Sequence, residues 1–182
     1  MDAASELDQL IQDALKALAQ DHHVAQWKAK EGNWVSYFAF KYLVPKCRPG
    51  TTLSHTAQIS VEVPVPQLSK FGRRAVPFDR RTVRKDIVIW SIPGGTCWDD
   101  KWSASIHPLA ILEWKVHRPP RKNPLVSQER EWLREYCMMN TSVLAYAIEV
   151  DGIRCPRAIT CARFLGEAED EKWFEIECGN PL

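Results

Sequence analysis

The sequence predicts a mixed α/β fold (an α+β arrangement), in which one β-sheet of mixed strand directions packs between helices. Three observations predict it. Apolar residues recur at helical spacing near the N-terminus, alternating or continuous apolar runs follow, and one helical pattern separates the third and fourth of these runs. A helix between two successive strands is typical of a crossover. We expect residues 1–25 to form an N-terminal helical extension and residues 26–182 a single domain.

Two helices are expected first. Apolar residues at helical spacing predict a helix over residues 3–20, which Asp2 or Ser5 can cap equally well. A second helix is expected over residues 29–44, because Pro45 cannot continue it.

Glu31 is the one acid in this second helix, and it lies on the apolar face. At about 100° per residue, it falls in a narrow arc with three apolar side chains, Val35, Phe38 and Tyr42. An acid in that place either caps the first turn or points into a site. The sequence leaves both open.

Apolar runs predict five strands, at residues 57–65, 85–90, 109–116, 143–150 and 172–178. Between the third and fourth, residues 127–140 read as a helix with Ser127 as its cap. Residues 67–83 are expected to form a basic loop or an extended hairpin. The stretch before the last strand has no clear pattern; it contains Arg154, Arg157 and Arg163.

A long loop over residues 91–108 separates the second and third strands. It is rich in glycine, proline, serine and aromatic residues, and it is too long for a tight hairpin. Loops of this length beside a site usually carry function. Trp98 and Trp102 are therefore candidates for stacking on a base, whereas the other tryptophans are expected in the core.

The composition is that of an ordinary globular protein, with 45% hydrophobic and 26% charged residues. The chain has no run of about 20 apolar residues that would span a bilayer. Its acidic N-terminus does not read as a secretion signal, so a cytoplasmic protein is expected. None of the six cysteines forms a CxxC pair, and reduced thiols are favoured over disulfides or zinc ligands.

The net charge of +1 hides two basic stretches, at residues 70–85 and 115–122. Each adjoins one of the candidate site residues described below, which favours contact with phosphate groups. The residues expected to bind nucleic acid are Arg73, Arg74, Arg80, Arg81, Arg84, Lys85, Arg118, Arg121 and Lys122.

Three residues carry the expected chemistry. In the strand at 109–116, Glu113 and Lys115 project from one face while their neighbours face the other way. Asp86 stands at the start of another apolar strand. Carboxylates from two strands can hold Mg²⁺ with Mn²⁺ as a substitute, the backbone carbonyl of Trp114 can add an oxygen, and the lysine can orient water or neutralise phosphate charge.

Asp86 followed by Glu113-Trp114-Lys115, in this order of elements, resembles the PD-(D/E)xK or restriction-endonuclease-like nuclease superfamily. The resemblance covers about residues 29–150. It implies an α-β-β-β-α-β core with the acids and the lysine at one end of a mixed sheet, preceded here by an extra N-terminal helix. It also implies catalytic roles for Asp86, Glu113 and Lys115, and Glu31 sits where many members keep an additional acid.

Two features depart from the family pattern. Lys85 stands where the family has proline before its first aspartate, and the gap from Asp86 to Glu113 is longer than in compact members. The alternatives to a shared site are a surface ion pair for Glu113 and Lys115, and a pairing of Asp86 with Arg84 or Lys85. Glu62 can be a solvent-facing strand residue or a site acid.

The expected function is metal-dependent hydrolysis of phosphodiester bonds, with DNA as the favoured substrate. The alternative is an inactive nuclease-fold protein that serves as a nucleic-acid-binding or assembly subunit. A zinc- or histidine-dependent hydrolase ranks last because His55, His107 and His117 are scattered. No membrane contact is expected. A homodimer or a partner protein can supply specificity, because no sequence-reading module stands out.

Overall fold

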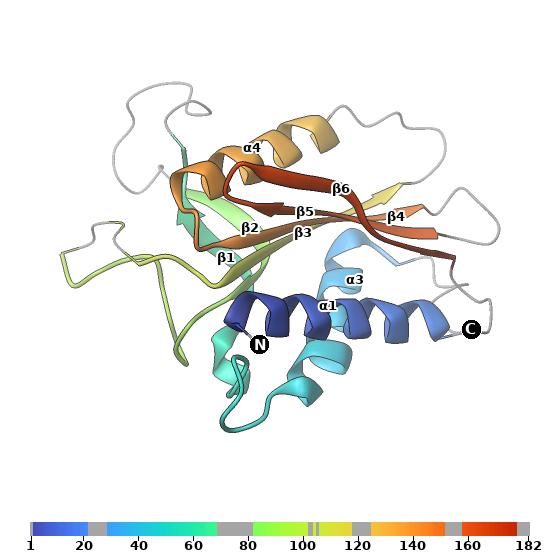
Figure 1. Ribbon diagram of the computed structural model, residues 1–182, viewed down its shortest axis with the longest axis horizontal. Helices are drawn as coiled ribbons and strands as arrows, with labels where there is room; N and C mark the ends of the chain where they lie inside the picture. Colours follow the sequence, from blue (N-terminus) through green and yellow to red (C-terminus); the bar gives the residue numbers. More distant parts are fainter. Residues whose placement is uncertain are drawn as a thin grey trace.

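The computed structural model describes residues 2–21, 29–68, 82–101, 104, 106–117, 125–151 and 158–177. One six-stranded mixed sheet lies between helices on its two faces (Figure 1). Helices α1 (Ala3–Gln20) and α3 (Glu31–Phe38) lie on one face, and α4 (Leu125–Met139) lies on the other. The mixed α/β class is confirmed.

The strands are adjacent across the sheet in chain order. They are β1 (Ile59–Pro66), β2 (Thr82–Ile89), β3 (Ala110–His117), β4 (Leu144–Asp151), β5 (Ala158–Leu165) and β6 (Ala168–Glu177). Neighbours are antiparallel except β3 and β4, which are parallel and joined through α4. The crossover expected between the third and fourth strands is therefore observed.

Helix α1 is part of the main core. Asp2 caps it, because its Oδ1 accepts a hydrogen bond from the Ser5 N–H at 2.7 Å. Its buried apolar side chains pack in the same cluster as α3 and the sheet; they include Leu7, Ile11, Leu15 and Leu18. The expected domain boundary at residue 25 lies outside the described residues.

Helix α3 is shorter than the expected 29–44. It ends at Phe38 and continues as a π-helical turn (Ala39–Leu43) and a 3₁₀ turn (Val44–Lys46). Tyr37 and Tyr42 both donate to the Asp21 carboxylate at 2.9 Å. Because they are five residues apart, an i to i+5 turn brings them to one side of the helix.

Two apolar clusters fill the two sides of the sheet. The first joins α1 and α3 to alternate side chains of the strands, among them Ile87, Leu112 and Trp114. The second joins α4 to the opposite face, with Val88 and Ile111. Leu112 and Trp114 thus face away from Ile111, as the alternation of β3 predicts.

The sequence prediction missed β5, which carries the unassigned Arg163. Its residues are buried in a mixed pattern rather than in clean alternation, because β5 is an interior strand covered on both faces. The last strand begins at Ala168, earlier than expected, after a tight turn at Gly166 with φ +56°. Helix α4 begins at Leu125, so the prediction that Ser127 caps it is wrong.

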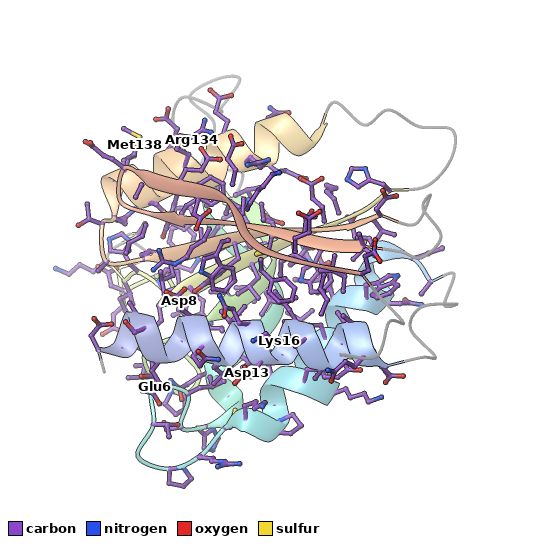
Figure 2. All side chains as sticks on the ribbon, turned by 45° about the vertical axis from the view of Figure 1, so that its right-hand side comes forward. Glu6, Asp8, Asp13, Lys16, Arg134 and Met138 are labelled. Atoms are coloured by element: carbon purple, nitrogen blue, oxygen red, sulfur yellow. The ribbon has the colours of Figure 1, made fainter. Side chains whose placement is uncertain are left out.

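Polar contacts hold α1 against β4 and β5. Asp8 points from α1 toward the strands (Figure 2) and accepts hydrogen bonds from the Tyr146 hydroxyl and the Arg163 Nε, each at 2.7 Å. Glu169 of β6 likewise binds Arg130 and Arg134 of α4. These contacts brace both helical layers against β4, β5 and β6.

None of the described helices combines the length and the continuous apolar run needed to cross a bilayer. Four cysteines in the described part are free thiols: Cys47, Cys97, Cys137 and Cys161. Cys155 and Cys178 lie outside the described residues.

Candidate active site

The site lies where β1 and β2 change the face on which they pack. Residues two apart in a regular strand share a face, yet Val61 packs in the α1/α3 cluster and Val63 packs in the α4 cluster. Lys85, the cross-strand partner of Val63, also turns toward α4. The change occurs at Glu62, whose φ is +55°, and at Asp86 on the neighbouring strand. Positive φ is uncommon for a residue other than glycine.

Beyond this point β2 separates from β3. Their pairing ends at Leu112. The next N–H of β3 that faces β2 belongs to Trp114, and it donates to Asp86 Oδ2 at 2.7 Å. Two residues further, the Val116 N–H donates to Glu31 Oε2 at 3.2 Å. Two carboxylates thus take the place of a neighbouring strand along this part of β3.

The sequence left open whether Glu31 caps its helix or points into a site, and its contacts favour the second. Glu31 is the first residue of α3, and the helix has no side-chain cap at Lys30. Its carboxylate turns to β3, where Oε1 lies 3.0 Å from the Nζ of Lys115. Glu31 therefore points into the site. Glu62, the other uncertain acid, is exposed.

Lys115 joins the two helical layers. Besides Glu31 of α3, its Nζ contacts Glu129 Oε1 of α4 at 3.1 Å. Sequence reasoning did not single out Glu129, because it saw only an acid near the start of a helix. A signal was present: α4 follows β3 directly in the chain, and a crossover helix packs over the strand that it leaves.

Lys85 is not a surface residue. Its side chain is 2% exposed, its ammonium forms an ion pair with the Glu113 carboxylate, and Nζ lies 3.7 Å from the centre of the Trp132 ring. The prediction that Lys85 contacts nucleic acid is therefore wrong. The sequence could not indicate this, because regular alternation places Lys85 on the face opposite Glu113.

Burial and mutual repulsion raise the pKa values of three acids, Asp86, Glu113 and Glu129. Burial, followed by the charge of Glu113, raises the pKa of Asp86 to about 8. Each of the two carboxyl groups affects the pKa of the other, so they lie close together. Burial raises the pKa of Glu113 although Lys85 opposes this, and burial raises that of Glu129 against the effect of Lys115.

The pKa of Lys115 is raised. Burial acts to lower it, but Glu31 and Glu129 outweigh that effect. Lys115 therefore stays protonated over the physiological pH range. A permanently charged ammonium can donate hydrogen bonds and neutralise negative charge, but it does not serve as a general base.

The chemistry of the donor set is compatible with one Mg²⁺ or Mn²⁺ ion. Asp86 and Glu113 bring adjacent carboxyl groups, and the N–H and C=O of one strand residue point to the same side, so the Trp114 carbonyl faces β2 as well. In the described part of the chain, no three His, Cys, Asp or Glu side chains converge on a metal position. Mg²⁺ commonly takes one or two carboxylates and keeps several waters.

Four carboxylates and two lysines form the cluster, namely Glu31, Asp86, Glu113, Glu129, Lys85 and Lys115. With all of them ionised, two negative charges remain uncompensated. One divalent cation would balance them.

Most of the expected phosphate-binding residues lie outside the described residues: Arg73, Arg74, Arg80, Arg81, Arg118, Arg121 and Lys122. The first of these segments is followed by Thr82, where β2 begins, and the second is preceded by His117, where β3 ends. Both residues lie at the end of the sheet that carries Asp86 and Glu113. Arg84 is exposed on β2. His117 contacts Glu149 of β4 at 2.8 Å.

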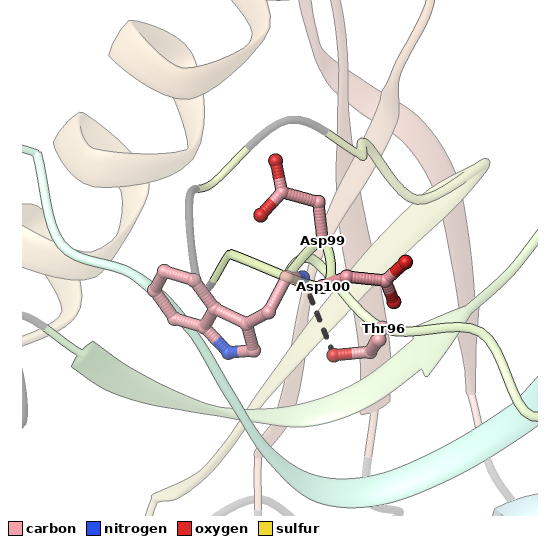
Figure 3. A pocket seen from close by; sticks show the side chains of 4 residues that line it. Thr96, Asp99 and Asp100 are labelled. Atoms are coloured by element: carbon pink, nitrogen blue, oxygen red, sulfur yellow. Dashed lines mark hydrogen bonds between the residues drawn. The ribbon is translucent and has the colours of Figure 1, made fainter.

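The long loop between β2 and β3 forms a surface pocket of about 390 Å³, lined by Thr96, Trp98, Asp99 and Asp100 (Figure 3). The Trp98 N–H donates to the Thr96 hydroxyl at 3.4 Å. Trp98 also packs against the α4 cluster, so part of its ring is core. Trp102, the other candidate for base stacking, lies outside the described residues.

Comparison with known proteins gives no further assignment: no family model, no curated protein and no solved structure matches the chain.

Proposed function

We propose that the protein is a metal-dependent nuclease of the PD-(D/E)xK type, which hydrolyses phosphodiester bonds, most readily in DNA. The observation that carries the proposal is the adjacent pair of carboxyl groups, Asp86 and Glu113, with Lys115 on the same strand as Glu113. The order α3, β1, β2, β3, α4, β4, with β3 and β4 parallel, agrees with the restriction-endonuclease-like core and supports the same assignment.

Each residue has a distinct task in this proposal. Asp86 and Glu113 hold the metal, and the Trp114 carbonyl completes the protein ligands. Bound Mg²⁺ supplies an acidified water and neutralises charge on the phosphate. Lys115 orients the attacking water or donates to a phosphate oxygen, and Glu31 and Glu129 fix its ammonium in place.

The buried charges favour catalysis over a purely structural role. Two carboxyl groups desolvated side by side cost free energy, and one of them has a pKa near 8. Buried acids with raised pKa values cluster at functional sites, where ligand binding or catalysis offsets the free energy lost by burying them. The basic segments that adjoin β2 and β3 would hold the nucleic-acid backbone near the acids.

The test is a cleavage screen. Purified protein is incubated with plasmid, single-stranded DNA, duplex oligonucleotides and RNA, in Mg²⁺, Mn²⁺ or EDTA. Cleavage that needs a divalent ion, and that Glu113→Gln abolishes, supports the proposal. The control is Glu171→Gln, an exposed acid of β6, which should cut like wild type. Loss of cleavage in Glu113→Gln alone, after the same purification, excludes a contaminating nuclease.

One observation favours the alternative, an inactive nuclease-fold subunit. The Lys85 ammonium already neutralises Glu113, as a metal ion would in an active site. Under this alternative the protein binds nucleic acid with the same affinity in Mg²⁺ and in EDTA, and cuts nothing in the screen.

A further inference from the structure

Lys85 is the residue of the cluster that the proposed reaction does not use. It is buried between an acid and an aromatic ring: the carboxylate of Glu113 on β3 and the face of Trp132 on α4. Trp132 is itself fixed, since its Nε1 donates to Gln67 at 2.7 Å and its ring stacks on Tyr136 at 4.8 Å. The ammonium is therefore held from two sides.

This position has a cost that packing alone does not require. Burying an ammonium group is unfavourable unless it is paired, and an apolar side chain of similar length would fill the same space. The strand also has to change face at Asp86 to bring Lys85 to the α4 side. A strand without that change would turn Lys85 away from Glu113.

Lys85 Nζ pairs with Oε1 of Glu113, so the ammonium holds the carboxylate through one of its two oxygens. A cation at this position also repels a divalent ion bound to the same carboxylate.

We propose that Lys85 is a built-in counter-ion of the metal site: it fixes Glu113 through one oxygen and lowers the affinity of the site for a divalent cation. Lys85 is thus a positioning residue that does not touch the substrate. This inference rests on the proposed function, because it assumes that Asp86 and Glu113 hold a metal.

The experiment measures Mn²⁺ binding to the full chain by calorimetry, together with the melting temperature in EDTA and in Mn²⁺. The variants are Lys85→Met, Glu113→Gln, and the two combined. Lys16→Met on α1, whose side chain is half-exposed, controls for the change in total charge.

Lys85→Met should bind Mn²⁺ at least about ten-fold more tightly than wild type, because a unit charge about 6 Å from a divalent ion repels it by about 1.4 kcal/mol even at the dielectric constant of bulk water, about 80. It should melt lower than wild type in EDTA, because Glu113 loses its partner, and gain more from Mn²⁺ than wild type gains. Lys16→Met should bind as wild type does.

Binding by Lys85→Met that equals or is weaker than that of wild type overturns the role of Lys85 and leaves the proposed function standing. A wild type that binds no Mn²⁺ overturns both. If Lys85→Met does not fold, the combined variant decides: folding once both charges are removed supports a counter-ion, and failure to fold overturns the role of Lys85 as the counter-ion of Glu113.

Discussion

The carboxylate of Asp86 accepts a hydrogen bond from the backbone N–H of Trp114, at 2.7 Å, across the gap where β2 leaves β3. In a continuous ladder that N–H would donate to a carbonyl of β2. The side chain of Asp86 therefore supplies the acceptor that β2 no longer provides to β3. The same hydrogen bond holds the Asp86 carboxylate next to Glu113. The separation of β2 from β3 at Asp86 thus accounts both for the irregular pairing of the sheet and for the position of the Asp86 carboxylate in the candidate site.

The stability of the metal-free protein should fall as the pH rises from about 4 to about 8. Asp86 has an ordinary pKa of 3.8, which the fold raises to about 8. The folded state therefore binds a proton more tightly than the unfolded chain between these values, and its contribution is complete below the lower pKa and lost through the higher one. Glu113, whose pKa is also raised, acts in the same direction.

Asp86→Asn should flatten this dependence, because the amide does not titrate. The measurement is urea unfolding in EDTA at several pH values between 4 and 9. Equal slopes of unfolding free energy against pH for wild type and variant would remove Asp86 as their cause. Affinity for Mn²⁺ should rise over the same range, since the metal needs the ionised carboxylate.

Glu129→Gln should slow cleavage by about 10- to 100-fold, the usual effect of losing a residue that orients a site group. Glu129 contacts Lys115 rather than the metal ligands, so the affinity for Mn²⁺ should change little. An unchanged rate would show that Glu129 only stabilises the fold.

Asp8→Ala should destabilise the protein by about 2–3 kcal/mol, because it leaves the Tyr146 hydroxyl and the Arg163 guanidinium without their acceptor. Asp13→Ala is the matched control on the same helix (Figure 2). Its pair with Lys16 spans 4.0 Å at the surface, so the change should stay within about 0.5 kcal/mol. Equal losses in chemical unfolding would mean that the Asp8 contacts do not anchor α1.

The basic segments should make binding depend on salt. If Arg80 and Arg81 contact phosphates, replacing both by alanine should reduce the slope of log affinity against log salt concentration by about two. Binding is measured with catalytically silent Glu113→Gln as the background. A slope that does not change would exclude phosphate contacts at these two positions.

The alternation of β3 was enough to predict that Glu113 and Lys115 share a face, because β3 is a regular interior strand. The same reasoning failed for Lys85. Its strand changes face at Asp86, and a period-two pattern cannot reveal such a change. Glu62, at which β1 changes face, gave no signal either, since nothing in its sequence neighbourhood demands a positive φ.

Contacts between elements that are distant in the chain could not be predicted from the sequence either. Glu31 could be placed on the apolar face of its helix, but the choice between a cap and a site depended on where α3 packs against β3. Glu129 required the position of α4 over the same strand. The fold class, by contrast, followed from local patterns that the packing did not override.

The central claim is that Asp86, Glu113 and Lys115 act at one phosphodiester-cleaving site. Its most direct test is single-turnover cleavage of an end-labelled DNA duplex in Mn²⁺ by wild type, Asp86→Asn, Glu113→Gln and Lys115→Met, with folding checked by circular dichroism. We expect wild type to cut and each folded variant to lose at least about 100-fold in rate. A wild type that cuts no substrate, or any folded variant of the three that cuts at the wild-type rate, would contradict the claim.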